Sequence, residues 1–254
     1  MSSKTERGRG ETAPNCAALP ITAPASSCDP SEDADISKID FNGRYVLLRC
    51  DLNVPLREGP EGGFVIRDDS RARLSLPTLD CLLHGGARVA VFSHLGRPEP
   101  GTHAAAFSLR PVADFFARER PAAFRGFVDD CVGPAVHAAV TQLQAGEFVV
   151  LENTRFHAGD EANDEAFARA LLDASRADVV VLDAFGAAHR AHASVSGIAS
   201  LAAEAYPGLL LRQEVRFLTA AMWKAQRPFC CVVGGAKVAD KIGVLKVSDE
   251  LLAV

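Results

Sequence analysis

Short apolar runs alternate with longer segments of helical period along this chain from Arg44 onward. The apolar runs predict β-strands at 45–50, 88–93, 124–128, 148–151, 178–182 and 229–233. The segments of helical period predict helices at 70–84, 108–118, 135–144, 164–175, 195–204 and 211–224. Because the strands are apolar throughout, both of their faces should be buried. The alternation of strand and helix therefore predicts a doubly wound, three-layer α/β fold around a parallel sheet.

Turn residues support two of these helix ends. Gly85 and Gly86 follow the helix predicted at 70–84, where glycine commonly ends a helix. Ser108 is predicted to be the N-cap of the next helix, with Pro111 in its first turn.

The first 40 residues differ in composition from the rest of the chain. They are rich in Ser, Thr, Ala and Pro and contain several acidic residues, without the apolar core of a signal peptide or the acid-free composition of a transit peptide. We predict that residues 1–40 are a disordered extension. Residues 41–205 are expected to form one α/β domain, and residues 206–254 a hinge and the first elements of a second.

Charge and cysteine content exclude several classes of protein. The formal net charge of −5 gives no general attraction to nucleic acids or anionic membranes. No apolar run approaches the length of about 20 residues that a membrane span needs. The seven cysteines show no metal-binding spacing, and reduced thiols predict a cytoplasmic protein. A redox role for the adjacent Cys230 and Cys231 is the alternative, but neighbouring residues of a strand point to opposite faces.

Polar residues follow the predicted strands, at the edge where α/β sheets bind ligands. They are Asp51 and Asn53 after the first strand, His94 and Arg97 after the second, Arg155 after the fourth, and His189 and Arg190 after the fifth. Arginines bind phosphates and carboxylates in bidentate geometry, so this clustering predicts an anion-binding site. The alternative is a set of separately solvated surface arginines. Asp51 and Asn53 are expected to hydrogen-bond substrate hydroxyls and to orient the arginines.

His189 and His192 are spaced to lie on one face of a helix, as zinc ligands can. No cysteine or carboxylate partner has suitable spacing, so we expect no metal-ligating residues. Both histidines are expected instead to donate hydrogen bonds to the anion or to cap a helix.

A second candidate phosphate site lies near the C-terminal end of the sequence. The P-loop pattern is absent, but Gly234 and Gly235 follow the apolar run 229–233 and precede Lys237 and Lys241. Glycines there allow the backbone to approach phosphate, and the two lysines would share a helix face. An ordinary turn before a basic helix is an equally good interpretation.

Several motifs together resemble the phosphoglycerate kinase family, in the same order, between Arg44 and Gly243. They are RCDLNVPL, DDSRARLSLPTL, SHLGRPEP, SLRPVA, FVDDCVG, LENTRFH, DAFGAAHRAHAS and GGAKVADKIGV. The resemblance implies two α/β domains joined by a hinge, of which the first binds 3-phosphoglycerate and the second binds ATP or ADP with Mg²⁺. It implies a monomeric glycolytic enzyme that transfers a phosphoryl group reversibly between ATP and 3-phosphoglycerate, with 1,3-bisphosphoglycerate as the other product.

The resemblance also assigns roles to individual residues. It implies that 3-phosphoglycerate is bound by Asp51, Asn53, Arg71, His94, Arg97, Arg155 and Arg190. It makes Arg71 and Lys237 the catalytic residues that stabilise the transferring phosphoryl group, and Lys237 and Lys241 the nucleotide-binding residues.

The sequence departs from the family pattern at Leu52, Leu182 and Ala187, where the family usually has Phe, Asn and Thr. The chain ends at Val254, before the family's later nucleotide motifs and its magnesium-holding acidic residue. We therefore expect an incomplete nucleotide-binding domain. A catalytically silent 3-phosphoglycerate-binding module and an interaction protein stay open as alternatives.

Overall fold

The computed structural model describes residues 35–60, 62–223, 228, 230 and 232. Its centre is a six-stranded sheet in the order β5-β6-β4-β1-β7-β8, in which every neighbouring pair is parallel. The strands are β1 (Tyr45–Cys50), β4 (Arg88–Phe92), β5 (Phe124–Val128), β6 (Phe148–Leu151), β7 (Val179–Asp183) and β8 (Ala205–Pro207). The chain leaves β1 for β4 on one side and returns to β7 on the other, which is the connectivity of a doubly wound sheet.

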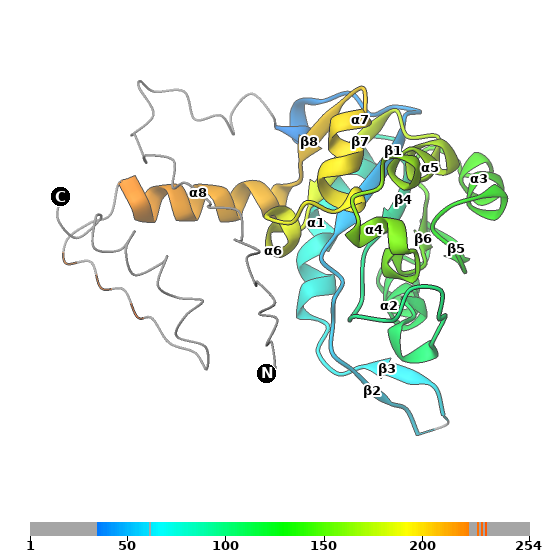
Figure 1. The fold of residues 1–254 in the computed structure, drawn as a ribbon. Coiled ribbons are helices and arrows are strands. Elements are labelled where there is room, and N and C mark those ends of the chain that lie inside the picture. The colour runs from blue at the N-terminus through cyan, green and yellow to red at the C-terminus, as the bar shows by residue number, and fades with distance from the viewer. Residues whose placement is uncertain (1–34, 61, 224–227, 229, 231, 233–254) are drawn as a thin grey trace, which may run out of the picture.

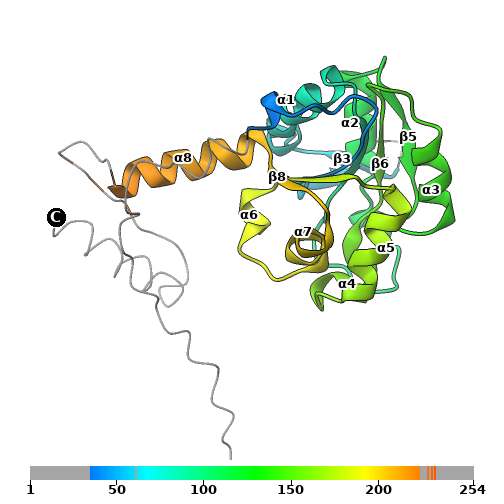
Figure 2. The ribbon, with the colours of Figure 1, turned by 90° about the horizontal axis from the view of Figure 1, so that it is seen from above.

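Helices cover both faces of this sheet (Figures 1 and 2). The described helices are α1 (Ser70–His84), α2 (Arg110–Glu119), α3 (Pro134–Thr141), α4 (Ala158–Glu161), α5 (Glu165–Ser175), α6 (Phe185–Ala188), α7 (Ile198–Leu201) and α8 (Leu209–Trp223). Short 3-10 helices lie at η1 (Ile36–Lys38), η2 (Ala105–Phe107) and η3 (Thr154–Phe156), and a π-helix at η4 (Ala193–Gly197).

The core is divided between the two faces because successive strand residues point in opposite directions. Val46 and Leu48 of β1 join a cluster that includes residues of α1 and α2, whereas Leu47 joins a second cluster with residues of α3, α5 and α7. All three side chains are fully buried. The apolar strands thus form the central layer of the predicted three-layer fold.

Most predicted elements are confirmed, and the helix expected at 195–204 is confirmed over part of its length. Helical structure runs from Ala193 to Leu201 as η4 and α7, and the strand β8 follows at Ala205. β8 pairs with β7, and this pairing supplies backbone hydrogen bonds that local sequence does not reveal. The antiparallel hairpin of β2 (Leu56–Glu58) and β3 (Phe64–Ile66) was not predicted, because its strands are too short to give a clear pattern. The strand predicted at 229–233 and the end of the helix predicted at 211–224 lie outside the continuously described residues.

The expected disordered extension is corrected at its C-terminal end. Ile36 forms part of η1 and is buried in the core cluster beside α1. Its apolar side chain fills a site at the edge of that cluster, so residues 35–40 belong to the folded domain. The expected boundary between residues 205 and 206 falls within β8, and its position stays a prediction.

α8 begins beside the sheet and extends away from it (Figure 2). Its first turn is held by side chains of the domain: the Thr78 hydroxyl accepts the Leu209 N–H at 3.0 Å, and the buried Asp183 carboxylate accepts the Leu211 N–H at 3.0 Å. Asp183 thus stabilises the helix N-terminus, where negative charge is favourable. Within the described residues no helix is long and apolar enough to cross a membrane.

Candidate anion-binding site

The polar residues singled out in the sequence lie in loops that follow the parallel strands. Asp51 and Asn53 follow β1, and His94 and Arg97 follow β4. Arg155 lies in η3 directly after β6, and Arg190 follows α6 beyond β7. Since all of these strands are parallel, their carboxyl ends lie at one edge of the sheet. This confirms the expected placement of the loops.

Arg71 connects the start of α1 to the loop after β1. Its Nη1 lies 3.2 Å from each carboxylate oxygen of Asp51 and donates to the Asn53 carbonyl at 3.1 Å. The Asn53 side-chain oxygen in turn accepts the Gly96 N–H at 2.9 Å. The Arg71 side chain is 51% exposed, so this ion pair contributes little to stability. Its effect is to set the relative positions of α1 and the loops after β1 and β4.

Asn153 holds the turn that presents Arg155. Its side-chain oxygen accepts the backbone N–H groups of Leu95 and Arg155, each at 3.1 Å. Its amide nitrogen donates to the carbonyls of Leu95 at 2.7 Å and Phe107 at 2.9 Å. A fully buried asparagine with these bonds fixes η3 against the loop after β4.

Arg155 is 5% exposed, yet its guanidinium is only partly satisfied. Nη1 donates to the Gly96 carbonyl, and Nε lies 3.0 Å from the Glu161 carboxylate without hydrogen-bond geometry. Among the described residues, Nη2 has no hydrogen-bond partner. Burial lowers the pKa of Arg155, and the charges of Arg190 and Arg97 lower it further against the opposing effect of Glu161. This side chain is a buried cation with donors available to an anion.

Arg49 is a site residue that the sequence analysis missed. It lies near the carboxyl end of β1 and is 1% exposed. Its Cζ lies over the Phe92 ring, 5.4 Å from the ring centroid. Its Nη2 lies 2.9 Å from His94 Nδ1, and its Nη1 donates to the Cys50 carbonyl. A lone arginine within an apolar strand was the available signal, but only packing shows that it reaches the site.

His94 is held in its neutral form. A guanidinium only donates hydrogen bonds, so Nδ1 of His94 accepts from Arg49 and the ring proton lies on Nε2. Burial lowers the pKa of His94 to about 2, and the charges of Arg49, Arg155 and Arg190 contribute. His94 therefore offers a neutral N–H donor beside the arginines.

This depressed pKa predicts a loss of stability in acid. The unfolded chain protonates His94 near its ordinary pKa of 6.5, whereas the folded chain excludes that proton down to about 2. Stability should therefore fall as pH drops below 6.5, by up to about 1.4 kcal/mol per pH unit. Urea unfolding of the wild type and of His94→Gln across this range measures the effect. If the difference in unfolding free energy between the wild type and His94→Gln does not change with pH, the prediction is wrong.

The remaining cations complete one side of the site. Arg97 is exposed and Arg190 is half-buried, and neither side chain forms a hydrogen bond or ion pair with another described residue. Burial lowers the pKa of His192, with Arg155 and Arg190 adding to the effect. His189 is exposed at the end of α6, and its ring makes no hydrogen bond within the described part of the chain. Lys237 and Lys241 lie outside the described residues.

The structure is that of a parallel α/β domain with incompletely paired arginines at the carboxyl edge of its sheet, the edge at which such sheets usually bind ligands. The family model described as phosphoglycerate kinase matches residues 36–251 of this chain. The chain belongs to the phosphoglycerate kinase family.

Curated relatives and solved structures agree with this assignment. The phosphoglycerate kinase of Synechococcus sp. (strain JA-3-3Ab) is 46% identical over 220 residues, which are 83% of this chain and 51% of that protein. The chloroplastic phosphoglycerate kinase of Volvox carteri is 43% identical over 84% of this chain and 44% of its own length. The chain thus spans about half the length of these relatives.

Two solved structures show the same fold. The phosphoglycerate kinase of Coxiella burnetii is 35% identical to this chain, with a TM-score of 0.70. The match covers 83% of this chain and 50% of that protein. The phosphoglycerate kinase of Pyrococcus horikoshii OT3 is 28% identical to this chain, with a TM-score of 0.72. The match covers 84% of this chain and 52% of that protein.

The departures from the family pattern lie mainly in the packing. Leu52 is fully buried in the core, and Ala187 is buried in a small apolar cluster with Ala184 and Val195. Leu52 still donates its backbone N–H to the Ser93 hydroxyl at 3.0 Å. The loop after β1 therefore keeps its connection to the loop after β4.

Proposed function

We propose that this domain binds 3-phosphoglycerate and that the protein transfers a phosphoryl group reversibly between ATP and the carboxylate of that substrate. The observation that carries the proposal is the buried Arg155, whose Nη2 has no partner within the described structure and whose pKa is lowered by burial and by the neighbouring Arg190 and Arg97. Desolvating a cation without full pairing is costly, and a bound phosphate would supply the missing acceptor oxygens.

In this proposal the two ends of the substrate meet different groups. Arg97, Arg155 and Arg190 bind the phosphate, with the Nε2 proton of His94 as an added donor. The substrate carboxylate points toward Arg71. The loop of Asp51 and Asn53 accepts a hydrogen bond from the substrate hydroxyl and donates one to it. The bond between Arg71 and Asp51 holds the guanidinium in place before substrate arrives.

The proposed chemistry depends on charge neutralisation. A carboxylate acceptor is already ionised near neutral pH, so no general base is needed. Arg71 and Lys237 would stabilise the charge on the transferring phosphoryl oxygens, and Lys241 would bind nucleotide phosphates. The return of the phosphoryl group from 1,3-bisphosphoglycerate uses the same contacts.

Mg²⁺ is proposed to enter with ATP or ADP and to neutralise charge on the nucleotide phosphates. The described site does not fit a magnesium ion of its own, because its carboxylates of Asp51 and Glu161 are paired with Arg71 and Arg155. The nucleotide contacts of Lys237 and Lys241 belong to residues outside the described part of the chain.

We further propose a monomeric enzyme of glycolysis that works in the cytoplasm. Free cysteines at positions 50, 81, 131 and 230 fit a reducing compartment. The relative from Volvox carteri is named chloroplastic, so fractionation of source cells against compartment markers tests this part of the proposal.

Isothermal titration of the purified chain with 3-phosphoglycerate tests the central claim. We expect saturable binding at one site, and much weaker binding of glycerate, which lacks the phosphate. A coupled ATP-dependent assay on the same sample separates the kinase from its alternative: turnover supports the reaction, and binding without turnover supports a catalytically silent module. Folded protein that binds no 3-phosphoglycerate would overturn the proposed site.

A further inference from the structure

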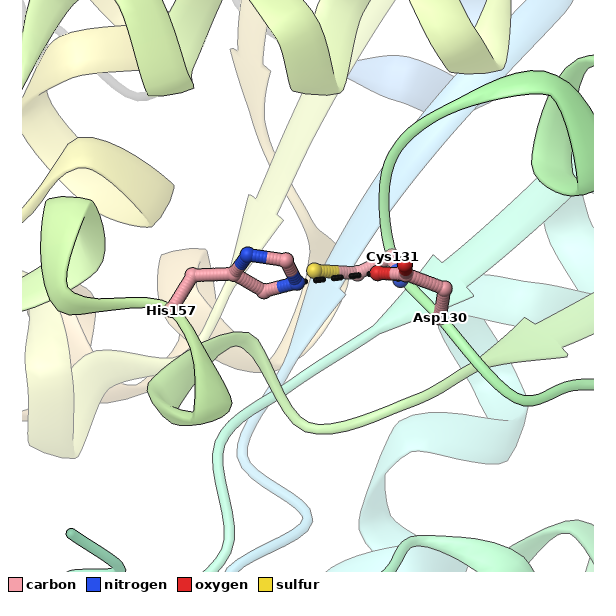
Figure 3. A group of neighbouring side chains, drawn as sticks. All are labelled: Asp130, Cys131 and His157. Carbon is pink, nitrogen blue, oxygen red and sulfur yellow. Dashed lines mark hydrogen bonds and ion pairs between the residues drawn. The ribbon is translucent and has the colours of Figure 1, made fainter. Parts of the chain in front are cut away.

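Asp130, Cys131 and His157 form a cluster outside the arginine site (Figure 3). Asp130 and Cys131 lie in the loop after β5, and His157 follows η3, 27 residues from Asp130 in sequence. One carboxylate oxygen, the thiol sulfur and one ring nitrogen lie within 4.8 Å of one another. His157 Nε2 and Asp130 Oδ1 are 2.9 Å apart. No metal ligands were expected from the sequence, because no cysteine lies at a metal-binding spacing from another cysteine or a histidine.

We propose that Asp130, Cys131 and His157 form a binding site for a divalent transition metal, Zn²⁺ in particular, with a fourth coordination position open to solvent. Carboxylate oxygen, thiolate sulfur and imidazole nitrogen are the donor types that Zn²⁺ binds, and three protein ligands with one free position is an established arrangement. On binding, the hydrogen bond between His157 Nε2 and Asp130 breaks, and the Nε2 proton moves to Nδ1 by exchange with solvent. The thiol proton passes to solvent, and the ion forms bonds to Sγ, Nε2 and a carboxylate oxygen.

The ligand groups are held in place by their surroundings. The Asp130 carboxylate accepts the N–H groups of Cys131 at 2.6 Å and Val132 at 3.3 Å, which fixes the loop. The His157 ring stacks on Phe167 with ring centroids 5.1 Å apart. Such preorganisation lowers the entropy cost of assembling a metal site.

The cluster is accessible from solvent and lies in a negative field. The side chains of Asp130 and His157 are 41% and 28% exposed, while Cys131 lies beneath them at 1%. The Asp130 and Asp160 carboxylates place negative charge around the Cys131 sulfur. This field favours a bound cation.

Metal binding would also act on the neighbouring arginine site. His157 lies directly beyond η3, the turn that contains Arg155, so the ion would connect that turn to the loop after β5. This consequence rests on the proposed function, whereas the metal site itself does not.

Titration of the full-length, reduced chain with Zn²⁺ tests the site by calorimetry. We expect one site per chain that weakens in both Cys131→Ser and His157→Gln. Loss of a direct ligand should cost at least the roughly 10–100-fold loss of affinity seen when outer-shell partners are removed. Co²⁺ should give a thiolate-to-metal charge-transfer band in the wild type and not in Cys131→Ser.

Cys81→Ser and His137→Gln are the matched controls, because both residues lie outside the cluster. They should keep the wild-type affinity and the Co²⁺ band. His157→Gln alters a partly exposed residue, so it remains informative if the buried Cys131→Ser variant fails to fold. Equal Zn²⁺ affinity in the wild type and His157→Gln, or a Co²⁺ spectrum without sulfur ligation, overturns the proposal. Binding of 3-phosphoglycerate is measured separately and decides only the arginine site.

Discussion

Replacing Arg155 with methionine is expected to weaken 3-phosphoglycerate binding by about 30-fold to 5,000-fold, equivalent to about 2–5 kcal/mol. The buried guanidinium faces the proposed phosphate with an Nη2 that no described residue satisfies. Its removal takes away the buried charge-assisted partner of the phosphate and leaves only the more exposed Arg97 and Arg190. Because methionine has similar length and no charge, it also relieves the repulsion from Arg97 and Arg190. The free energy of unfolding should therefore change much less than the binding free energy.

Titration calorimetry and urea unfolding of the same variant separate these two effects. Arg169→Met is the matched control, because Arg169 is exposed on α5 and pairs with Glu165 four residues earlier. We expect that control to bind 3-phosphoglycerate with wild-type affinity. Wild-type affinity in a folded Arg155→Met protein would contradict the assignment of the phosphate to this arginine.

Replacing Gly96 with alanine is expected to damage both stability and binding. Gly96 has φ +63°, and a Cβ there would lie 2.5 Å from Cε1 of the Phe107 ring. The left-handed conformation costs an alanine about 1–2 kcal/mol, and the overpacking costs about 1–3 kcal/mol. The same residue donates its N–H to Asn53 and accepts from Arg155, so relief of the clash should displace both site residues.

Gly101→Ala isolates the backbone contribution. Gly101 also has a positive φ, of +82°, but an added Cβ would meet nothing within 4 Å. We expect Gly101→Ala to lose only about 1–2 kcal/mol of unfolding free energy and to keep its affinity for 3-phosphoglycerate. Urea unfolding and calorimetry on both variants make the comparison. Equal losses of stability would show that Phe107 does not restrict this turn, and retained affinity in Gly96→Ala would show that the turn does not position the site.

The local hydrophobic pattern was sufficient to predict the bounds of a strand or helix where its burial agrees with its periodicity. β1 and β6 begin and end at the predicted residues because they are apolar and buried on both faces, and α1 does so because Gly85 and Gly86 follow it. β5 also matches its predicted bounds, although this edge strand has no fully buried residue. The edge of the sheet that carries the site followed from the parallel arrangement. The roles of the residues at that edge, by contrast, came from the resemblance to a family, and their test is binding.

The sequence by itself therefore determined the layered α/β architecture, the family, and the loops that carry the arginines, because these depend on periodicity and on the order of strands. Only the tertiary structure decided that β8 is a strand, that Ile36 belongs to the core and that Arg49 reaches His94. It alone placed His157 beside Asp130 and Cys131, which follow a different strand. Each of these depends on contacts between residues far apart in the chain, and a local pattern does not record the partner that supplies the hydrogen bond, the apolar neighbour or the second ligand.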